Sequence, residues 1–306
     1  MKATRCARRT RLPRMIDASR IALVGVDWGT TNLRAFALDG EGAVLDRRAD
    51  DRGAAGLSPD RFAAVLEELA GDWRADGAPV LVCGMAGARG GWIEAPYVEA
   101  PAALADLIAH LTEAAPGVRI VPGVCKRADG RLMDVMRGEE TQVLGALIDG
   151  VAVCPGTHSK WVRLQAGRIT DLRTVMTGEL FAVLRAHSIL GRNMTEGPFD
   201  AAAFDEGVDR GLADPALTAA LFSVRTAGLD GRLAPSAAPD YLSGLLIGAE
   251  IAGAGGGFEG PVHLIGAPAL NDRYGRALSR AGRASTAIDP EAAVTRGLWC
   301  LWKDTA

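Results

Sequence analysis

Two short turns of the chain place glycine beside hydroxyl side chains, a composition suited to holding phosphate groups. The first turn covers residues 29–32 (GTTN) and the second covers residues 156–159 (GTHS), and each follows an apolar run. Backbone N–H groups and hydroxyls in such a turn can surround phosphate oxygens, because glycine leaves no side chain in the way. Either turn alone is also consistent with an ordinary hairpin. As a repeated pair, the two turns predict a polyphosphate gripped from both sides.

Asp27 ends the first apolar run, shortly before its turn. A carboxylate at this place can hold Mg²⁺, usually through water, because magnesium keeps much of its hydration shell in protein sites. The alternative is that Asp27 only accepts hydrogen bonds from the turn amides. The chain contains no G-x-x-x-x-G-K-[ST] sequence, so the nucleotide site of P-loop proteins is excluded.

The two turns belong to a longer internal repeat. Residues 24–32 (VGVDWGTTN) recur 127 residues later as residues 151–159 (VAVCPGTHS), and Gly40 is matched by Gly167. Each copy has the pattern of an apolar strand, a turn, a second strand, a Gly-bearing turn and a third strand. The repeat therefore predicts two related half-molecules whose Gly-Thr turns face each other across a cleft.

Apolar strand-like runs alternate with helix-period segments, a pattern that indicates an α/β architecture. Strands are predicted at residues 21–26, 33–38, 80–83, 151–153 and 262–265. Helices are predicted to begin at Pro59, Pro101 and Pro290, because proline suits the first helical position, and a fourth apolar stripe runs through residues 143–148.

The composition is typical of a globular protein. The 306 residues are 48% hydrophobic and 23% charged, which suggests about two domains with an ample core. A net charge of −3 argues against a nucleic-acid partner, and no apolar run approaches the roughly 20 residues that a membrane span needs. The five scattered cysteines fit reduced thiols in a cytoplasm, and the four scattered histidines form no zinc signature.

The first twenty residues differ from the rest of the chain. They hold seven basic side chains and one acidic side chain, whereas the remainder holds 27 basic and 36 acidic ones. A basic start of this kind is compatible with a transit peptide, a nucleic-acid arm or a disordered extension, but it has no apolar segment of the secretory type. We expect residues 1–20 to be a disordered extension outside the fold.

Several segments resemble the acetate and sugar kinase, Hsc70 and actin superfamily. Residues 24–34 (VGVDWGTTNLR) and 153–161 (VCPGTHSKW) are similar to its two phosphate motifs, residues 137–145 (RGEETQVLG) to its first connecting helix, and residues 263–270 (HLIGAPAL) to its adenosine motif. Within it, the chain resembles the 2-dehydro-3-deoxygalactonokinase family through residues 27–36, 83–97 (CGMAGARGGWIEAPY), 136–142, 155–161 and 176–192. The resemblance begins near residue 21. One departure is Ala267-Pro268, where a more glycine-rich turn is common.

This resemblance implies two ribonuclease-H-like lobes of the actin-like ATPase fold, each a mixed sheet flanked by helices, with a cleft between them. The N-terminal lobe would cover residues 21–148 and the C-terminal lobe residues 149–306, and a last helix at 290–302 would pack back at the hinge. The implied activity is ATP-dependent, Mg²⁺-requiring phosphorylation of the 6-hydroxyl of 2-dehydro-3-deoxy-D-galactonate in the cytoplasm. A kinase for a related 2-keto-3-deoxy sugar acid and a nucleotide-binding switch are the alternatives, and a homodimer is left open.

The resemblance also implies roles for residues of the two turns. Asp27 would hold Mg²⁺ through water, Lys160 would face phosphate, and Gly266 and Ala267 would border the adenine. The phosphate loops would be formed by Gly29, Thr30 and Thr31 and by Gly156, Thr157, His158 and Ser159.

The catalytic base is sought among the acidic residues that begin the connecting helix, Glu139 and Glu140. We favour Glu140, because it directly precedes Thr141, as the carboxylate does in some hexose kinases of the superfamily. The alternative is that both acids only complement the helix dipole. Asp134 is the reserve candidate.

The implied substrate carries a carboxylate and a 2-keto group, so its pocket should supply a planar cation. Arginine binds carboxylates through two parallel hydrogen bonds, and Arg34, Arg89 and Arg137 all lie in the matching segments. Asn32 and Trp92 complete the predicted substrate-binding set. Trp92 would wall the sugar, although packing beside the neighbouring glycines is equally compatible with its position.

Overall fold

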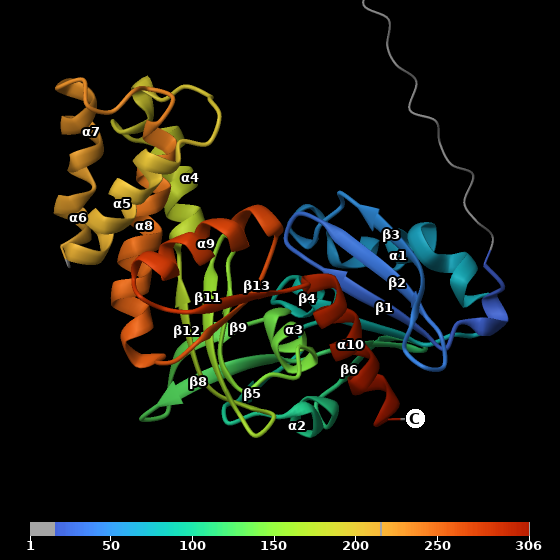
Figure 1. The fold of residues 1–306 in the computed structure, drawn as a ribbon. Helices are drawn as coiled ribbons and strands as arrows, with labels where there is room; N and C mark the ends of the chain where they lie inside the picture. The colour runs from blue at the N-terminus through green and yellow to red at the C-terminus, as the bar shows by residue number, and fades with distance from the viewer. Residues whose placement is uncertain (1–15, 215, 306) are drawn as a thin grey trace, which may run out of the picture.

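The computed structural model describes residues 16–214 and 216–305, which fold into two lobes (Figure 1). The N-terminal lobe is built on a six-stranded sheet and the C-terminal lobe on a five-stranded sheet, and a smaller sheet has three strands. In sheet order, the first consists of β3 (Val44–Asp50), β2 (Leu33–Leu38), β1 (Leu23–Trp28), β4 (Val80–Gly84), β7 (Val118–Ile120) and β6 (Thr112–Ala115). The second consists of β12 (Arg168–Val175), β11 (Ser159–Gln165), β10 (Gly150–Cys154), β13 (Val262–Ile265) and β14 (Ser285–Ile288).

The two large sheets share one topology. In each, the first strand pairs antiparallel with the second strand and parallel with a strand that arrives after a helix: β1 with β2 and β4, and β10 with β11 and β13. The order β3-β2-β1-β4-β7 of one sheet thus corresponds to β12-β11-β10-β13-β14 of the other. This correspondence confirms the predicted fold of two related lobes. Both central strands are buried along nearly their whole length, which explains their unbroken apolar sequences.

The third sheet consists of β5 (Tyr97–Glu99), β8 (Gly123–Ala128) and β9 (Arg131–Met136). It is linked to β12 of the C-terminal lobe by side chains and backbone. Lys126 of β8 forms an ion pair with Asp171 at 2.5 Å, and Ala102 makes a backbone bridge to Ile169. Because residue 102 is held in this bridge, the helix predicted to begin at Pro101 begins three residues later, at Leu104.

The helices cover the outer faces of the sheets and the space between the lobes. A bundle around α8 stands at one end of the C-terminal lobe (Figure 1). The helices are α1 (Phe62–Ala70), α2 (Leu104–Ile108), α3 (Glu139–Gly145), α4 (Thr177–His187), α5 (Ala201–Ala213), α6 (Leu217–Ala220), α7 (Phe222–Leu229), α8 (Ala238–Ala254), α9 (Pro268–Arg280) and α10 (Pro290–Lys303). Within the described residues, none of them is both long and apolar enough to cross a membrane.

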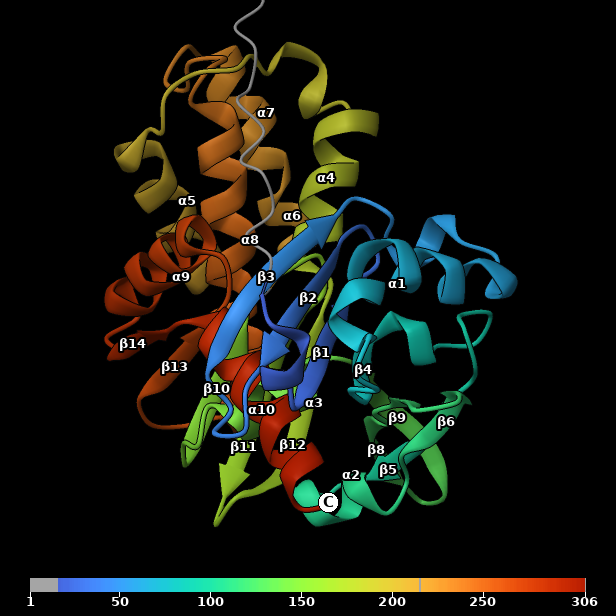
Figure 2. The ribbon, with the colours of Figure 1, turned by 90° about the vertical axis from the view of Figure 1, so that its right-hand side faces the viewer.

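Helices α3 and α10 cross each other in the centre of the molecule, between the two large sheets (Figure 2). Glycine permits the crossing, because a Cβ on Gly145 would lie 2.1 Å from the carbonyl oxygen of Ala293. A Cβ on Gly297 would lie 2.1 Å from the carbonyl oxygen of Thr141. The buried side chains around this crossing come from both lobes and form one continuous core. The start of α3 is therefore fixed relative to both lobes.

The predicted N-terminal extension lies mostly outside the described residues, which begin at residue 16. Residues 16–20 belong to the described fold: Ile16 packs against the core of the N-terminal lobe, and Ala18–Arg20 form a short 3₁₀ turn capped by Asp17.

Candidate active site

A cleft of about 720 Å³ lies between the lobes, and both Gly-Thr turns open into it. The start of α3, the segment that leads into α9 and the ends of β4 and β9 contribute further parts of its wall. The predicted site residues that line it are Asp27, Gly29, Thr30, Arg34, Arg137, Glu139, Gly156, Thr157, His158, Lys160, Gly266 and Ala267. Thr31 and Asn32 line an adjoining hollow together with Asp27 and Arg34. Segments more than 200 residues apart in the chain thus meet in one cleft.

The first turn is held mainly by backbone contacts. The N–H of Gly29 donates to the carbonyl of Asn32 at 2.9 Å, and the N–H of Ala54 donates to the carbonyl of Gly29 at 2.9 Å. Gly53 allows this close approach, because a Cβ there would lie 2.3 Å from the carbonyl oxygen of Thr30. Thr30 and Thr31 are exposed, and the Thr31 hydroxyl accepts a hydrogen bond from the Asn32 side-chain amide at 3.0 Å, so both hydroxyls can still donate to a ligand.

Asp27 and Arg34 face each other across the β1–β2 pair and form an ion pair beside this turn. The carboxylate of Asp27 is mostly buried, while about 39% of the Arg34 side chain is exposed. The Cys83 thiol lies 4.0 Å from the second oxygen of Asp27, which makes at most a weak hydrogen bond. The pair therefore presents one carboxylate and one cation to the first phosphate turn.

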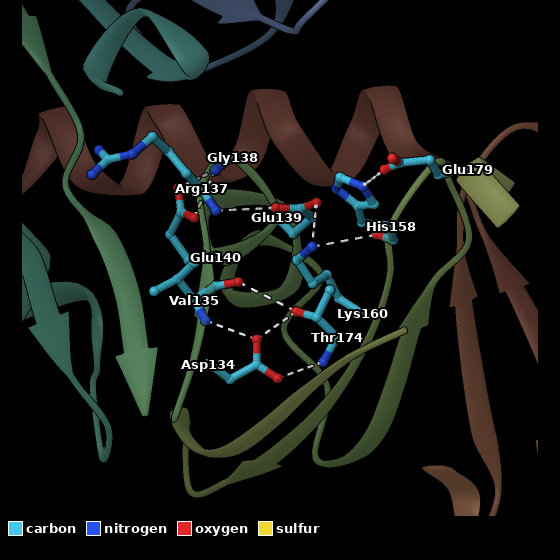
Figure 3. Close-up of polar contacts among 10 residues, drawn as sticks. All are labelled: Asp134, Val135, Arg137, Gly138, Glu139, Glu140, His158, Lys160, Thr174 and Glu179. Carbon is cyan, nitrogen blue, oxygen red and sulfur yellow. Dashed lines mark hydrogen bonds and ion pairs between the residues drawn. The ribbon is translucent and has the colours of Figure 1, made fainter. Parts of the chain in front are cut away.

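The second turn is braced by the start of α4. The N–H of Glu179 donates to the carbonyl of Thr157 at 2.9 Å, and the Glu179 carboxylate is bonded to the His158 ring (Figure 3). Gly178 makes this approach possible, because a Cβ there would lie 2.3 Å from the carbonyl oxygen of Gly156. Ser159 is completely buried and its hydroxyl is bonded to Tyr274 at 2.7 Å, so this side chain points into the lobe.

Glu139, the first residue of α3, points into the cleft (Figure 3). Its Oε1 lies 3.8 Å from Nζ of Lys160, and its Oε2 accepts a hydrogen bond from the N–H of Arg137 at 3.2 Å. Burial raises the pKa of Glu139, and the Lys160 ammonium opposes this rise by favouring the charged form. A carboxylate with a raised pKa beside a cation, in a cleft, is suited to proton transfer.

Glu140, the next residue, is fully buried and does not line the cleft. Its two oxygens accept from the N–H of Gly138 at 2.9 and 2.7 Å, and the Thr141 hydroxyl donates to it at 3.1 Å. Burial, with a smaller effect of the neighbouring Glu139 carboxylate, raises the pKa of Glu140 to about 8. The reserve candidate Asp134 is similarly engaged, because its carboxylate accepts two hydrogen bonds of 2.6 Å from the N–H and hydroxyl of Thr174 (Figure 3).

The remaining predicted substrate residues differ in where the fold places them. Arg137 is buried, its Nη2 donates to the carbonyl of Ala95 at 2.8 Å, and its guanidinium lies over the Tyr97 ring. Figure 3 shows this guanidinium pointing away from Glu139. Its Nε and Nη1 have no hydrogen-bond partner among the described residues. Trp92 is half-buried and stacks on Phe62 against the core of the N-terminal lobe, and Arg89 is exposed; neither lines the cleft.

A second pocket, of about 280 Å³, adjoins the phosphate turn at Gly156 and was not predicted from the sequence. It lies between α4, α8 and α9. Arg273 forms an ion pair with Asp240 at 2.7 Å and lies 4.8 Å over the ring of Phe199, giving the pocket a planar cation beside an aromatic ring. These residues share no local motif, so only the folded chain reveals that they meet.

Comparison with known proteins gives consistent results. The family model described as 2-keto-3-deoxy-galactonokinase matches residues 27–301. The chain is 38% identical to the 2-dehydro-3-deoxygalactonokinase of Escherichia coli (strain K12), over 90% of this chain and 95% of the relative. It is 44% identical to a Rhizobium meliloti (strain 1021) protein that carries the same name provisionally, over 89% of this chain and 94% of the relative. A crystal structure from Sinorhizobium meliloti, also provisionally so named, is 40% identical and covers 92% of this chain and 99% of its own, with a TM-score of 0.85.

Proposed function

Because the chain belongs to the 2-keto-3-deoxy-galactonokinase family, we propose that it transfers the γ-phosphoryl group of ATP to the 6-hydroxyl of 2-dehydro-3-deoxy-D-galactonate. The products are ADP and 2-dehydro-3-deoxy-6-phosphogalactonate. The observation that carries this proposal is the cleft, in which two Gly-Thr turns from related lobes meet Asp27 and Glu139. Phosphoryl transfer needs positioning and charge stabilisation more than covalent chemistry, and this wall of backbone amides, hydroxyls and charges suits that need.

The two turns hold the triphosphate in our proposal. Backbone N–H groups around Gly29 and Gly156 would surround its oxygens from opposite sides, and Lys160 would add a positive charge from the second lobe. The pocket beside Gly156 takes the nucleoside, with Arg273 against its base. Gly266 and Ala267, which were expected to border the adenine, line the cleft and not this pocket, so we place them where the nucleoside would join its phosphates.

Asp27 is the proposed residue for Mg²⁺. The described residues contain no group of three or more histidine, cysteine, aspartate or glutamate side chains that could hold a metal ion. Magnesium in kinase sites is commonly held by one or two carboxylates together with the substrate phosphates, and a single carboxylate beside the phosphate turn fits this donor set. When bound, the ion neutralises charge on the phosphates.

Glu139 is the residue that we propose as the catalytic base, with Glu140 as the alternative. The 6-hydroxyl oxygen attacks the γ-phosphorus, the bond to the β–γ bridging oxygen breaks, and the hydroxyl proton passes to the carboxylate. The placement of Glu139 in the cleft supports this choice, as does the burial of Glu140. Arg34 is the proposed contact to the substrate carboxylate, because its guanidinium is partly exposed at the cleft.

The proposal is tested by measuring ADP release from ATP and Mg²⁺ with a panel of sugar acids that includes the galacto and gluco forms of 2-keto-3-deoxy acids. We expect turnover that depends strongly on the galacto acid, and loss of it when Mg²⁺ is omitted. Equal or faster turnover of the gluco acid would indicate a kinase for a related 2-keto-3-deoxy sugar acid. Slow turnover that no sugar acid accelerates would indicate a nucleotide-binding switch. The cytoplasmic location and the homodimer stay predictions.

A further inference from the structure

A carboxylate is buried in the C-terminal half of α8, beside the pocket between α4, α8 and α9 that takes the nucleoside in our proposal and is called the nucleotide pocket below. Glu250 is only 3% exposed and lies between the apolar residues Ile247 and Ile251 of the same helix. Burying a carboxylate is costly unless donors surround it. An acidic residue at this place therefore indicates a specific arrangement of donors.

Each donor to Glu250 comes from a different element. The indole N–H of Trp161 on β11 donates at 2.8 Å, the hydroxyl of Tyr274 on α9 donates at 2.7 Å, and the hydroxyl of Thr177 at the start of α4 also donates. Burial raises the pKa of Glu250, while these donors favour the charged form. One carboxylate thus joins four elements of the C-terminal lobe.

The network extends to the second phosphate turn through Tyr274. Because a carboxylate only accepts hydrogen bonds, the Tyr274 hydroxyl gives its proton to Glu250 and can accept one from Ser159, 2.7 Å away. Ser159 directly follows the exposed part of the turn, Thr157 and His158. The contact of Glu250 with Thr177 holds the start of α4, which braces the same turn through the N–H of Glu179.

Two of the network residues also form the floor of the nucleotide pocket. Thr177 and Tyr274 line that pocket together with Gly156 and Arg273, while Glu250 lies behind them and does not line it. We propose that Glu250 is a positioning residue: it fixes the second phosphate turn and the pocket floor in the geometry that binds the nucleotide. This inference rests on the proposed function, because it takes ATP as the ligand of that pocket.

The network makes a distinct prediction for Ser159. With its hydroxyl committed to Tyr274, Ser159 contributes to phosphate binding through the position of the turn and not through its side chain. A purely structural role for Glu250 would lower stability without a selective effect on ATP. The measurements must therefore separate ATP affinity from the stability of the fold.

The test uses the full chain and the variants Glu250→Gln and Tyr274→Phe, with Asp205→Asn as the matched control. Asp205 holds Arg276 and Arg280 across the α5–α9 contact in the same lobe, and it lines neither the cleft nor the nucleotide pocket. The readouts are the Kd of ATP by calorimetry, kcat and both KM values, and the thermal midpoint. The probe ligand is ATP with Mg²⁺, measured without sugar acid.

We expect each network variant to raise the Kd and KM of ATP by about tenfold, as the loss of one hydrogen bond predicts. The kcat at saturating ATP and the KM of the sugar acid should change less than twofold. The double variant, Glu250→Gln with Tyr274→Phe, should bind ATP no worse than Glu250→Gln alone, because both substitutions break the same network. The inference is overturned if ATP affinity stays unchanged, or if Asp205→Asn weakens ATP binding equally at a similar thermal midpoint.

If Glu250→Gln does not fold, the same measurements on Tyr274→Phe test the proposal, because this variant removes one hydroxyl and keeps the ring. The proposed function fails separately, when the unsubstituted chain binds ATP but releases no ADP in response to any sugar acid. In that event the Kd values still decide the role of Glu250.

Discussion

Replacing Glu139 with glutamine removes the proposed base while preserving the size of the side chain. The amide oxygen of the new residue can still accept the hydrogen bond from the N–H of Arg137, so the start of α3 should keep its geometry. What the variant loses is the ability to take a proton from the substrate hydroxyl and the charge that faces Lys160. The adjacent Glu140→Gln variant is the matched control, because it removes a carboxylate from the same helical turn.

The expected magnitudes differ because the two side chains have different surroundings. A general base typically contributes a factor of 10²–10⁴ in rate, so Glu139→Gln should lower kcat by about that factor, equivalent to roughly 3–5 kcal/mol. Glu140 is fully buried and bonded to Gly138 and Thr141. Its replacement should change stability by about 1–3 kcal/mol and leave kcat within about threefold.

The assay measures kcat by ADP release at saturating ATP and sugar acid, and circular dichroism melting shows that both variants are folded. A Glu139→Gln protein that retains kcat within a few-fold of the parent would refute the reasoning. If Glu140→Gln instead lost a hundredfold or more while folded, the base would be the buried carboxylate, and the cleft would have to open around it during turnover.

Three further predictions concern stability and pH. Gly297→Ala should lower the free energy of unfolding, measured in urea, by at least about 1–3 kcal/mol, because its Cβ would meet the backbone of α3. The control is Gly253→Ala in α8, where a Cβ meets nothing within 4 Å, and this variant should be neutral or stabilising. The pKa of Glu140 is raised to about 8 in the folded state, so the folded protein holds a proton that the unfolded chain releases above about pH 4.5. The free energy of unfolding should therefore fall between about pH 4.5 and 8, by on the order of 1 kcal/mol per pH unit. Glu140→Gln should flatten this dependence, and a slope that survives the substitution would show that another group causes it. Lys160→Met removes the cation that lowers the pKa of Glu139, so the acid limb of the kcat/KM profile should move to higher pH, and an unmoved limb would exclude Glu139 as the titrating group.

The sequence alone was sufficient to predict the two-lobed fold. The apolar strands and Gly-Thr turns recur at a constant offset of 127 residues, and the structure confirms two sheets with the same strand order. Such features are local: a buried strand and a tight turn need particular residue types at fixed spacing, whatever surrounds them. The beginning of the connecting helix at Glu139 was expected from the family resemblance, and α3 begins at that residue.

Only the tertiary structure distinguishes neighbours that look alike in the sequence. Glu139 and Glu140 are both acids in a first helical turn, yet successive helical residues point about 100° apart, and the crossing with α10 decides which of them faces the cleft. Trp92 was expected either to wall the sugar or to pack beside the neighbouring glycines, and in the fold it packs against the core of the N-terminal lobe, stacked on Phe62.

The nucleotide pocket and the Glu250 network were not visible in the sequence. Their residues are spread over more than 100 positions, and each one by itself resembles an ordinary helix or strand residue. Local patterns therefore determined the lobes and the phosphate turns. Which side chains meet in the cleft, and which carboxylate holds the turn from behind, depends on contacts between distant segments, which form only when the helices pack on the sheets.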